Sequence, residues 1–299
     1  MSAGEPNVNV EPHAVASPAP NDGAELSRVA AGSLRRMSAE NFPVALRLLP
    51  RRVRDDLTRA YLFARFVDDV GDEARGDRLA MLAAVADDIR ALPSGRAQLA
   101  PVRGLFPLVR DHGLGTAPLL DLVEANRRDQ LTSSYEHFED LLEYCRFSAA
   151  PVGRIVLAVA GVDDATAIGR SDTVCNALQV LEHCQDVRED ALAGRVYLPA
   201  AELREAGVTR DDLTTVTTSL AVRTVVARQV GRAEAMLVQA GPLIRSLHGW
   251  ARLAVTGYAA GGRATIAALR GGDHDVLARH LAPSRASTLR YAAQLTVRR

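Results

Sequence analysis

Apolar residues recur at intervals of three or four positions along nearly the whole chain, from Leu26 almost to its end. This spacing is typical of amphipathic helices, and no run of alternating apolar and polar residues bounded by turn signals predicts a strand. Glycine and proline residues interrupt the pattern and mark the helix ends. The predicted helices are residues 26–37, 51–75, 77–91, 116–130, 137–160, 163–192, 199–206, 210–240, 242–270 and 273–281. The pattern therefore predicts an all-α helical bundle.

The N-terminal segment lacks this periodicity and is rich in Pro, Ala, Asn and Ser. Such a composition buries too little apolar surface to offset the entropy of ordering the chain, so we expect residues 1–24 to be a disordered tail. No shift in composition divides the rest of the chain. We therefore expect residues 25–299 to form a single domain, a length that is ample for one large core.

Composition and charge exclude several classes of protein. The chain has 299 residues, of which 47% are apolar and 24% charged, and its formal net charge of zero does not favour a nucleic-acid partner. Its three cysteines fit no zinc template and indicate a reduced, intracellular protein. No apolar run reaches the roughly 18–20 residues of a membrane span. The N-terminus lacks a charged region followed by an apolar block, so we expect no signal peptide. We expect a cytoplasmic protein whose contact with a membrane, if any, is peripheral, at the inner face.

A group of acids lies in the otherwise apolar stretch "YLFARFVDDVGDE", residues 61–73. Residues four apart on a helix lie on one face, about one turn from each other. Asp68 and Asp72 form one such pair, and Asp69 and Glu73 form a neighbouring pair. Two carboxylates one turn apart can bridge a divalent cation such as Mg²⁺, which takes few protein oxygens and keeps positions for water and phosphate.

The other interpretation of an isolated Asp-x-x-x-Asp pair is a solvated acidic end of a surface helix. Here the flanking sequence "RAYLFARFV" is apolar on most sides, which favours a central helix. Arg65 lies one turn before Asp68, and Tyr61 one turn before Arg65. The same face therefore carries a phenol, a guanidinium group and two carboxylates.

A second acidic face occurs in the predicted helix 163–192. Its members follow one another at spacings of three, four and four, which keeps them on one face: Gln179, Glu182, Asp186 and Asp190. Two helices with such faces can oppose each other across a cavity and hold Mg²⁺ ions between them. A diphosphate suits that arrangement, and Arg65 and Arg195 are cations suited to hold the same group.

His183 and Cys184 interrupt the second acidic stretch. They are adjacent, so on a helix they point about 100° apart, which is unsuited to a shared metal ion. We interpret both as packing residues.

A mostly apolar segment, residues 141–161, contains small residues and Pro151, which is expected to kink a helix there. Its small residues, such as Gly153, leave room for a long apolar ligand. Close helix packing explains them equally well, and the sequence alone does not separate the two interpretations.

These segments together resemble the squalene/phytoene synthase family of head-to-head prenyl synthases. The resemblance is carried by "YLFARFVDDVGDE", "EYCRFSAAPVG", "LEHCQDVREDALAGRVYLP" and "ARLAVTGYAAGGRATIAAL", and it extends over about residues 26–285. It implies a single-domain isoprenoid synthase-type bundle with a central cavity, and two or three Mg²⁺ ions.

The resemblance also implies roles for individual residues at matching positions. The implied Mg²⁺ ligands are Asp68, Asp72, Asp186 and Asp190, with Glu182 as a further oxygen ligand where many members carry Asn. Tyr144 is implied to act in catalysis with these aspartates. The implied substrate-binding residues are Asn41, Phe42, Tyr61, Arg65, Gln179 and Arg195. Many members carry Phe-Trp at positions 183 and 184, so this wall of the site departs from the family pattern.

Within the family, the segment "ENFPVALRLLPRRVRDDLTRAYLFAR" is most similar to the bacterial hopanoid-pathway branch, whose members act as hydroxysqualene synthases. The implied reaction converts presqualene diphosphate and water to hydroxysqualene and diphosphate. We expect no NADPH, in agreement with the lack of a dinucleotide-binding fingerprint. The alternatives are synthesis of presqualene diphosphate, squalene or phytoene from farnesyl or geranylgeranyl diphosphate, and a non-catalytic lipid-binding or assembly protein. Upstream and downstream enzymes of the squalene pathway are candidate partners.

Overall fold

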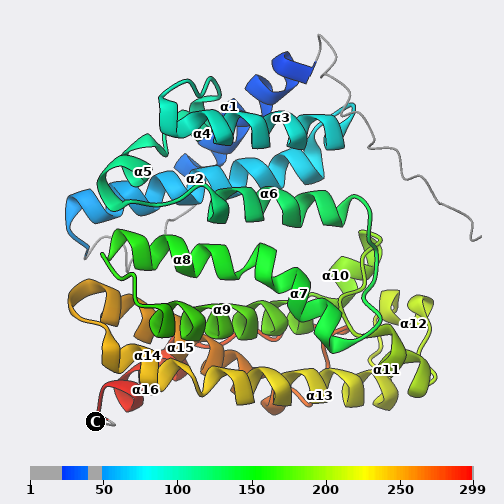
Figure 1. Cartoon of the computed structure of the whole chain (residues 1–299). Helices are drawn as coiled ribbons and strands as arrows, with labels where there is room; N and C mark the ends of the chain where they lie inside the picture. Colours follow the sequence, from blue (N-terminus) through cyan, green and yellow to red (C-terminus); the bar gives the residue numbers. More distant parts are fainter. Residues whose placement is uncertain (1–21, 40–48, 298–299) are drawn as a thin grey trace, which may run out of the picture.

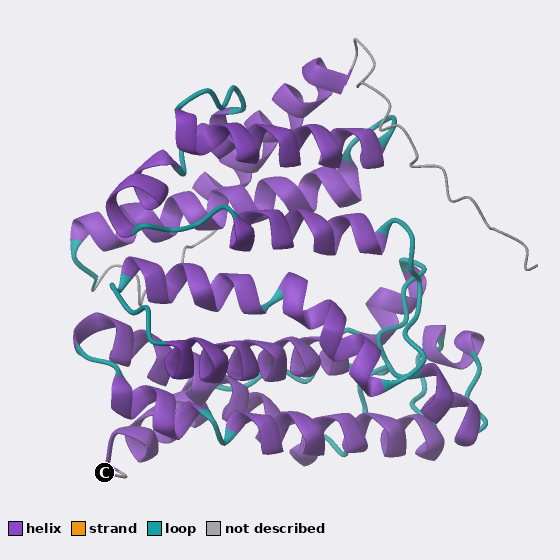
Figure 2. Cartoon of the chain, viewed as in Figure 1, coloured by secondary structure: helices purple, strands orange, loops and turns teal. Residues whose placement is uncertain are grey.

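The computed structural model describes residues 22–39 and 49–297 (Figure 1). Within these residues there is no β-strand, only an isolated bridge between Ser134 and Val196 (Figure 2). The prediction of an all-α fold is confirmed. The helices are α1 (Asp22–Ala39), α2 (Arg51–Glu73), α3 (Arg78–Ala91), η2 (Leu92–Ser94), α4 (Ala100–Arg103), α5 (Phe106–His112), α6 (Ala117–Asp129), α7 (Phe138–Ser148), α8 (Ala150–Val159), α9 (Ala165–Gln185), α10 (Val187–Leu192), α11 (Ala200–Glu205), α12 (Arg210–Thr214), α13 (Leu220–Leu237), α14 (Ala240–Ser246), α15 (Gly249–Gly271) and α16 (Arg285–Val297).

Four predicted helices are each divided into two shorter ones, namely those predicted at 137–160, 163–192, 210–240 and 242–270. Proline explains the first division, because Pro151 lacks the N–H that a continuous helix needs and instead lies in the first turn of α8. A side-chain cap marks the third division, within 210–240. The Ser219 hydroxyl accepts a hydrogen bond from Val222 N and caps the N-terminus of α13. Apolar periodicity continues through these breaks and therefore does not reveal them.

Other elements also differ from the prediction. The prediction of a helix at 273–281 was wrong. This segment forms turns, in which Asp273 and His274 both have a φ of 53°. Helix α16 was not predicted, and neither were the short helices between α3 and α6. Helix α1 starts at Asp22, so the last three residues assigned to the tail are helical.

The helices stack in layers that follow the chain from one end of the bundle to the other (Figure 1). One hydrophobic core is built by α1 to α6, and a second core by α7 and the helices that follow α8. Helix α8 lies between them: Ile155 packs into the first core and Leu157 into the second. The two acidic stretches therefore belong to different halves, α2 to the first and α9 to the second.

Small residues allow the layers to approach closely. A Cβ added to Gly153 would lie 2.5 Å from Ser171 Oγ and 2.6 Å from Cys175 Sγ, so this glycine serves the packing of α8 on α9. Of the two explanations left open for the small residues of 141–161, close helix packing is the one observed at Gly153. A Cβ on Gly71 would likewise clash with Asn126. The absence of a side chain at Gly71 therefore allows α6 to pack closely on α2.

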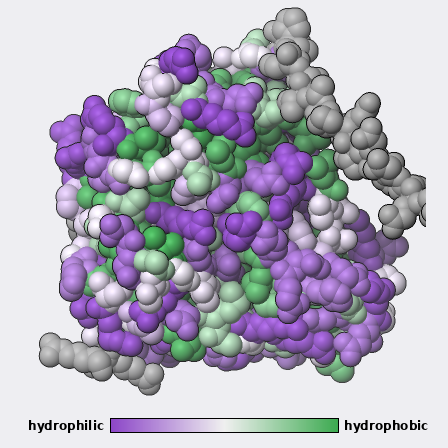
Figure 3. Space-filling view, viewed as in Figure 1, coloured by the Kyte–Doolittle hydropathy of each residue, from purple (hydrophilic) through white to green (hydrophobic). Residues whose placement is uncertain are grey.

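Polar residues cover most of the face shown in Figure 3, with smaller hydrophobic areas between them. None of the helices in the described part of the chain is both long and apolar enough to cross a membrane.

Candidate active site

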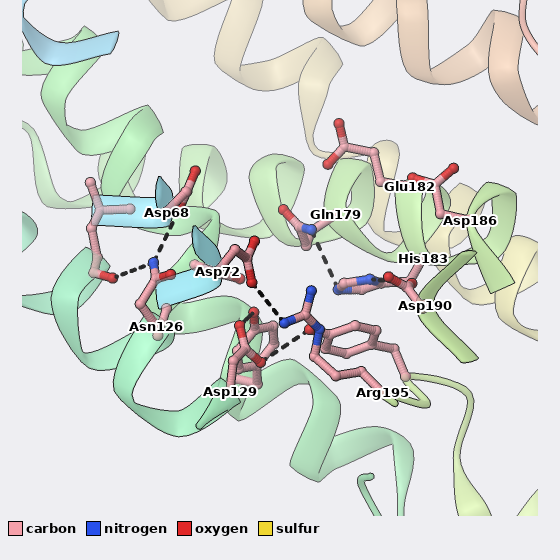
Figure 4. Close-up of a pocket in the computed structure, with 15 residues that line it drawn as sticks. Asp68, Asp72, Asn126, Asp129, Gln179, Glu182, His183, Asp186, Asp190 and Arg195 are labelled. Atoms are coloured by element: carbon pink, nitrogen blue, oxygen red, sulfur yellow. Dashed lines mark hydrogen bonds and ion pairs between the residues drawn. The ribbon is translucent and has the colours of Figure 1, made fainter. Parts of the chain in front are cut away.

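A polar pocket of about 320 Å³ opens where the two halves of the bundle meet (Figure 4). Helices α2 and α6 contribute one side of the pocket, and α7, α9, α10 and the segment after α10 contribute the other. The residues that line it are Asp68, Asp72, Leu122, Ala125, Asn126, Asp129, Tyr144, Ser148, Gln179, Glu182, His183, Asp186, Asp190, Arg195 and Tyr197. The two acidic stretches predicted from the sequence thus share one pocket.

The first acidic face, Asp68 and Asp72 on α2, is held by direct partners. Asn126 Nδ2 donates a hydrogen bond of 2.9 Å to Asp68 Oδ1, and the absence of a side chain at Gly71 lets Asn126 come this close. Arg195 Nη1 lies 2.9 Å from Asp72 Oδ1. Both carboxylates are therefore oriented before any ligand arrives.

The second acidic face, Glu182, Asp186 and Asp190, lies opposite the first in Figure 4. The chain leaves the helical conformation at Asp186, between α9 and α10. Backbone hydrogen bonds from Asp186 N to Glu182 O, at 3.0 Å, and from Asp190 N to Asp186 O, at 2.8 Å, continue across this break. The four-residue register therefore survives, and all three acids remain on the pocket side.

Burial raises the pKa of several acids of this pocket, and the like charges of neighbouring acids add to the rise. Asp68 is exposed to the open pocket, but many protein atoms surround its carboxylate. This burial raises the pKa of Asp68 to about 6, and the charge of Asp72 raises it as well, whereas the hydrogen bond from Asn126 lowers it. Burial likewise raises the pKa of Glu182 and of Asp186. A cation between the two faces would relieve this repulsion.

Arg195 brings a guanidinium group into the pocket. It follows Gly194, whose φ of 93° favours glycine, and Val196 N donates a 2.8 Å hydrogen bond to Ser133 O that fixes the segment. Beyond its ion pair with Asp72, Arg195 has a buried Nε with no hydrogen-bond partner among the described residues. A buried donor without a partner is costly, so this N–H is suited to an anionic ligand.

Aromatic rings form the wall beside Arg195. His183 stacks on Tyr197 with ring centroids 3.8 Å apart, and Tyr144 lies 5.5 Å from Tyr197. Asp129, at the end of α6, accepts hydrogen bonds from the hydroxyls of Tyr144 at 2.7 Å and of Tyr197 at 3.0 Å. The wall presents π faces and phenol groups to the same pocket as the acids.

The donor set fits Mg²⁺ bound together with a diphosphate, and not a preformed metal cage. Within residues 22–39 and 49–297, no three His, Cys, Asp or Glu side chains converge closely enough to hold one metal ion. Mg²⁺ is commonly held by one or two carboxylates while water and phosphate oxygens complete its shell. The carboxylate oxygens on the two faces, the raised pKa values and the unpartnered Arg195 Nε match that manner of binding.

Most of the predicted site residues lie together in this pocket: Asp68, Asp72, Tyr144, Gln179, Glu182, Asp186, Asp190 and Arg195. Tyr61 and Arg65 are not among its lining residues. Arg65 Nε lies instead 3.2 Å from Asp69 Oδ1, and Ser33 on α1 donates a hydrogen bond of 2.5 Å to the other oxygen of Asp69. Arg65 thus pairs with Asp69 on the same helix and not with either carboxylate of the first acidic face.

The predicted contacts Asn41 and Phe42 lie outside the described residues. Seven lining residues were not predicted as part of the site, among them Asn126, Asp129, His183 and Tyr197. His183 was interpreted as a packing residue; it is buried, but it also faces the pocket. The only sequence signal for the first two was the spacing of three that puts Asn126 and Asp129 on one face of α6.

The chain is similar in sequence and in fold to several known proteins. The profile of the family described as squalene/phytoene synthase matches residues 35–291. A hydroxysqualene synthase of Zymomonas mobilis is 35% identical over 216 residues, which are 70% of this chain and 71% of the relative. A presqualene diphosphate synthase of Rhodopseudomonas palustris is 33% identical over 74% of this chain and 76% of its own length. The crystal structure of squalene synthase HpnC from Alicyclobacillus acidocaldarius superimposes with a TM-score of 0.75 and 38% sequence identity, covering 84% of this chain and 96% of that one.

Proposed function

Because the chain belongs to the squalene/phytoene synthase family, we propose that it is a hydroxysqualene synthase, which converts presqualene diphosphate and water to hydroxysqualene and diphosphate. The observation that carries the proposal is the pair of acidic faces, Asp68 with Asp72 and Glu182 with Asp186 and Asp190, across one pocket. The hydroxysqualene synthases of Zymomonas mobilis and Sinorhizobium fredii, at 35% and 32% identity, favour this reaction within the family.

The acidic pocket is the place for the diphosphate. Asp68 and Asp72 on one side, and Glu182, Asp186 and Asp190 on the other, would hold two or three Mg²⁺ ions. When bound, these ions neutralise the charge that develops on the leaving diphosphate.

Arg195 contributes a fixed positive charge to the departing diphosphate. Its Nε, which has no hydrogen-bond partner in the part of the chain that the structure describes, would donate to a phosphate oxygen while its Nη1 remains on Asp72. This link ties the anion to the first acidic face. Because the donor is already in place, little reorganisation is needed when the carbon–oxygen bond breaks.

The aromatic wall is suited to the carbocation that remains. Tyr144, Tyr197 and His183 present π faces, which attract a cation within about 6 Å. We propose that a single water molecule reaching this wall ends the reaction by adding to the allylic cation. Since the substrate and product are largely hydrocarbon, we also propose that they are exchanged through peripheral contact with a membrane.

The test is the product formed from presqualene diphosphate and Mg²⁺, with and without NADPH, identified by mass spectrometry. We expect hydroxysqualene in both cases. Presqualene diphosphate as the end product from farnesyl diphosphate, or squalene formed only with NADPH, would overturn the proposed reaction in favour of the family's other activities. The relative that makes presqualene diphosphate, at 33% identity, is the reason to test both substrates.

A non-catalytic role is tested in cells. We expect the Asp68→Asn and Asp186→Asn variants to lose the biological role, because each removes a carboxylate from a different face. If both variants retained it, a lipid-binding or assembly protein would be the better explanation.

A further inference from the structure

Asp129 is an acid of the pocket that belongs to neither acidic face. It lies at the C-terminal end of α6, one turn after Asn126, and forms ion pairs with neither arginine nor lysine in the described part of the chain. Its partners are instead two phenols. An acid placed beside a developing carbocation needs an explanation, because a free carboxylate would react with the cation.

Each oxygen of this carboxylate is engaged by one phenol. Tyr144 donates to Oδ2 at 2.7 Å, and Tyr197 donates to Oδ1 at 3.0 Å. Both tyrosines are buried, and their rings lie 5.5 Å apart at a tilt of 33°. Three separate parts of the chain are thus joined at one point: the end of α6, the middle of α7 and the segment after α10.

The two hydrogen bonds act on the phenols as well as on the acid. A phenol that donates to a carboxylate gains electron density on its oxygen and ring, which strengthens the attraction between the ring and a cation. Burial raises the pKa of Tyr144 and of Tyr197, so both keep the proton that they donate. Since both tyrosines line the pocket, this added electron density lies at its wall.

We propose that Asp129 is a positioning residue that orients Tyr144 and Tyr197 and makes them electron-rich for the carbocation, while the two phenols shield its own oxygens. Shielded in this way, the carboxylate does not remove a proton from the carbon next to the cation, a step that would leave an alkene and a protonated Asp129. Water adds to the cation instead, and the proton it loses passes to the released diphosphate. The inference rests on the proposed function, because it requires a cation in this pocket.

Asp129→Asn tests the electronic part of the proposal with little change of shape. We expect kcat to fall about 10- to 100-fold, while KM and the half-saturating Mg²⁺ concentration stay within about threefold, because substrate and metal bind elsewhere in the pocket. Glu124→Gln is the matched control: Glu124 is also on α6, but it pairs with Arg127 at 2.7 Å away from the pocket. We expect the control to keep the activity of the unchanged protein.

The shielding part is tested by the double variant Tyr144→Phe with Tyr197→Phe. Removing both hydroxyls exposes the carboxylate, so we expect the ratio of alkene to alcohol among the products to rise. Adding Asp129→Asn to this double variant should bring the ratio down again, because the base is removed. Near-ultraviolet circular dichroism gives a readout independent of activity, and we expect Asp129→Asn to change the tyrosine signal while Glu124→Gln does not.

The inference is overturned if Asp129→Asn matches Glu124→Gln in kcat, or if the double variant forms no additional alkene. If the unchanged protein uses farnesyl diphosphate and not presqualene diphosphate, the proposed function fails separately. The kcat comparison is then made with farnesyl diphosphate, whose ionisation also places a cation beside this wall. A protein that turns over neither substrate refutes both.

Discussion

The two acidic faces carry similar residues but are supported very differently. On the first, Asp68 accepts a hydrogen bond from Asn126 and Asp72 pairs with Arg195, each at 2.9 Å. On the second, the contacts of Asp190 with His183 and of Asp186 with His280 are 3.7 and 3.8 Å long. The carboxylate of Glu182 has no hydrogen bond or ion pair in the described part of the protein.

This difference in side-chain support indicates that the two acidic faces have different roles in ligand binding. The first face is preorganised by neighbouring side chains on α6 and after α10, and the second lies at the break between α9 and α10, where few partners fix it. We infer that metal-bound diphosphate docks on the first face and orders the second. Binding energy is then used to assemble the complete site around the correct ligand.

The largest expected effect comes from removing one carboxylate from either face. Asp68→Asn and Asp186→Asn should each lower kcat/KM by at least about 100-fold, because each removes charge that would hold the metal-bound diphosphate. Steady-state kinetics with a labelled prenyl diphosphate measures this. Asp87→Asn is the control, since Asp87 pairs with Arg90 on the exposed surface of α3. If only one face proved necessary, the proposal of a joint site would fail.

The next largest effect concerns the support of the first face. Asn126→Ala removes the donor to Asp68, and we expect the half-saturating Mg²⁺ concentration to rise about 10- to 100-fold, as for other residues that orient metal ligands. Gly71→Ala should act in the same direction, because its Cβ would displace Asn126. Gly261→Ala serves as the control, as nothing lies within 4 Å of the Cβ it would add. An unchanged Mg²⁺ requirement in both test variants would show that the first face needs no such support.

A smaller effect is expected from pH. The pKa of Asp68 is about 6 in the folded protein and 3.8 as its ordinary value, so folding disfavours the ionised form. Without metal, this group makes the protein more stable as the pH falls from above 6 towards 4, and that gain is lost as the pH rises through 6. Mg²⁺ must displace the same proton, so its half-saturating concentration should rise roughly tenfold per unit below pH 6.

Thermal unfolding curves and Mg²⁺ titrations over this pH range measure both effects. In Asp68→Asn, the pH dependence of stability between 4 and 6 should become flatter, because the asparagine does not titrate. A variant with the pH dependence of the unchanged protein would show that another group is responsible.

The sequence predicted the all-α fold and both acidic faces because each depends on a local regularity. Helical periodicity reveals helices, and a spacing of three or four places Asp68 with Asp72, or Glu182 with Asp186, on one face. The contribution of α6 could not be predicted, because Asn126 and Asp129 reach the site only through the packing of α6 on α2 and α7. His183 was assigned to packing because it points about 100° away from Cys184 on a helix. Its stacking on Tyr197 could not be predicted, since Tyr197 lies beyond the break after α9.

The errors in helix boundaries have a similar cause. Apolar residues in 273–281 are buried and periodic. However, Leu277 N donates a hydrogen bond to Thr218 Oγ1, which lies in a loop distant in sequence, and the segment forms turns. Tertiary contacts thus override local preference where two loops meet. Residues such as Arg65 show the limit of spacing arguments: it shares a helix with Asp68, yet its Nε lies against Asp69.

The central claim is that two acidic faces hold one metal-bound diphosphate. Isothermal titration of inorganic diphosphate into the protein, with Mg²⁺ present and absent, tests it without any assumption about the prenyl substrate. We predict binding that requires Mg²⁺ and is lost in both Asp68→Asn and Asp186→Asn. Binding that persists without Mg²⁺, or in either variant, would contradict the account.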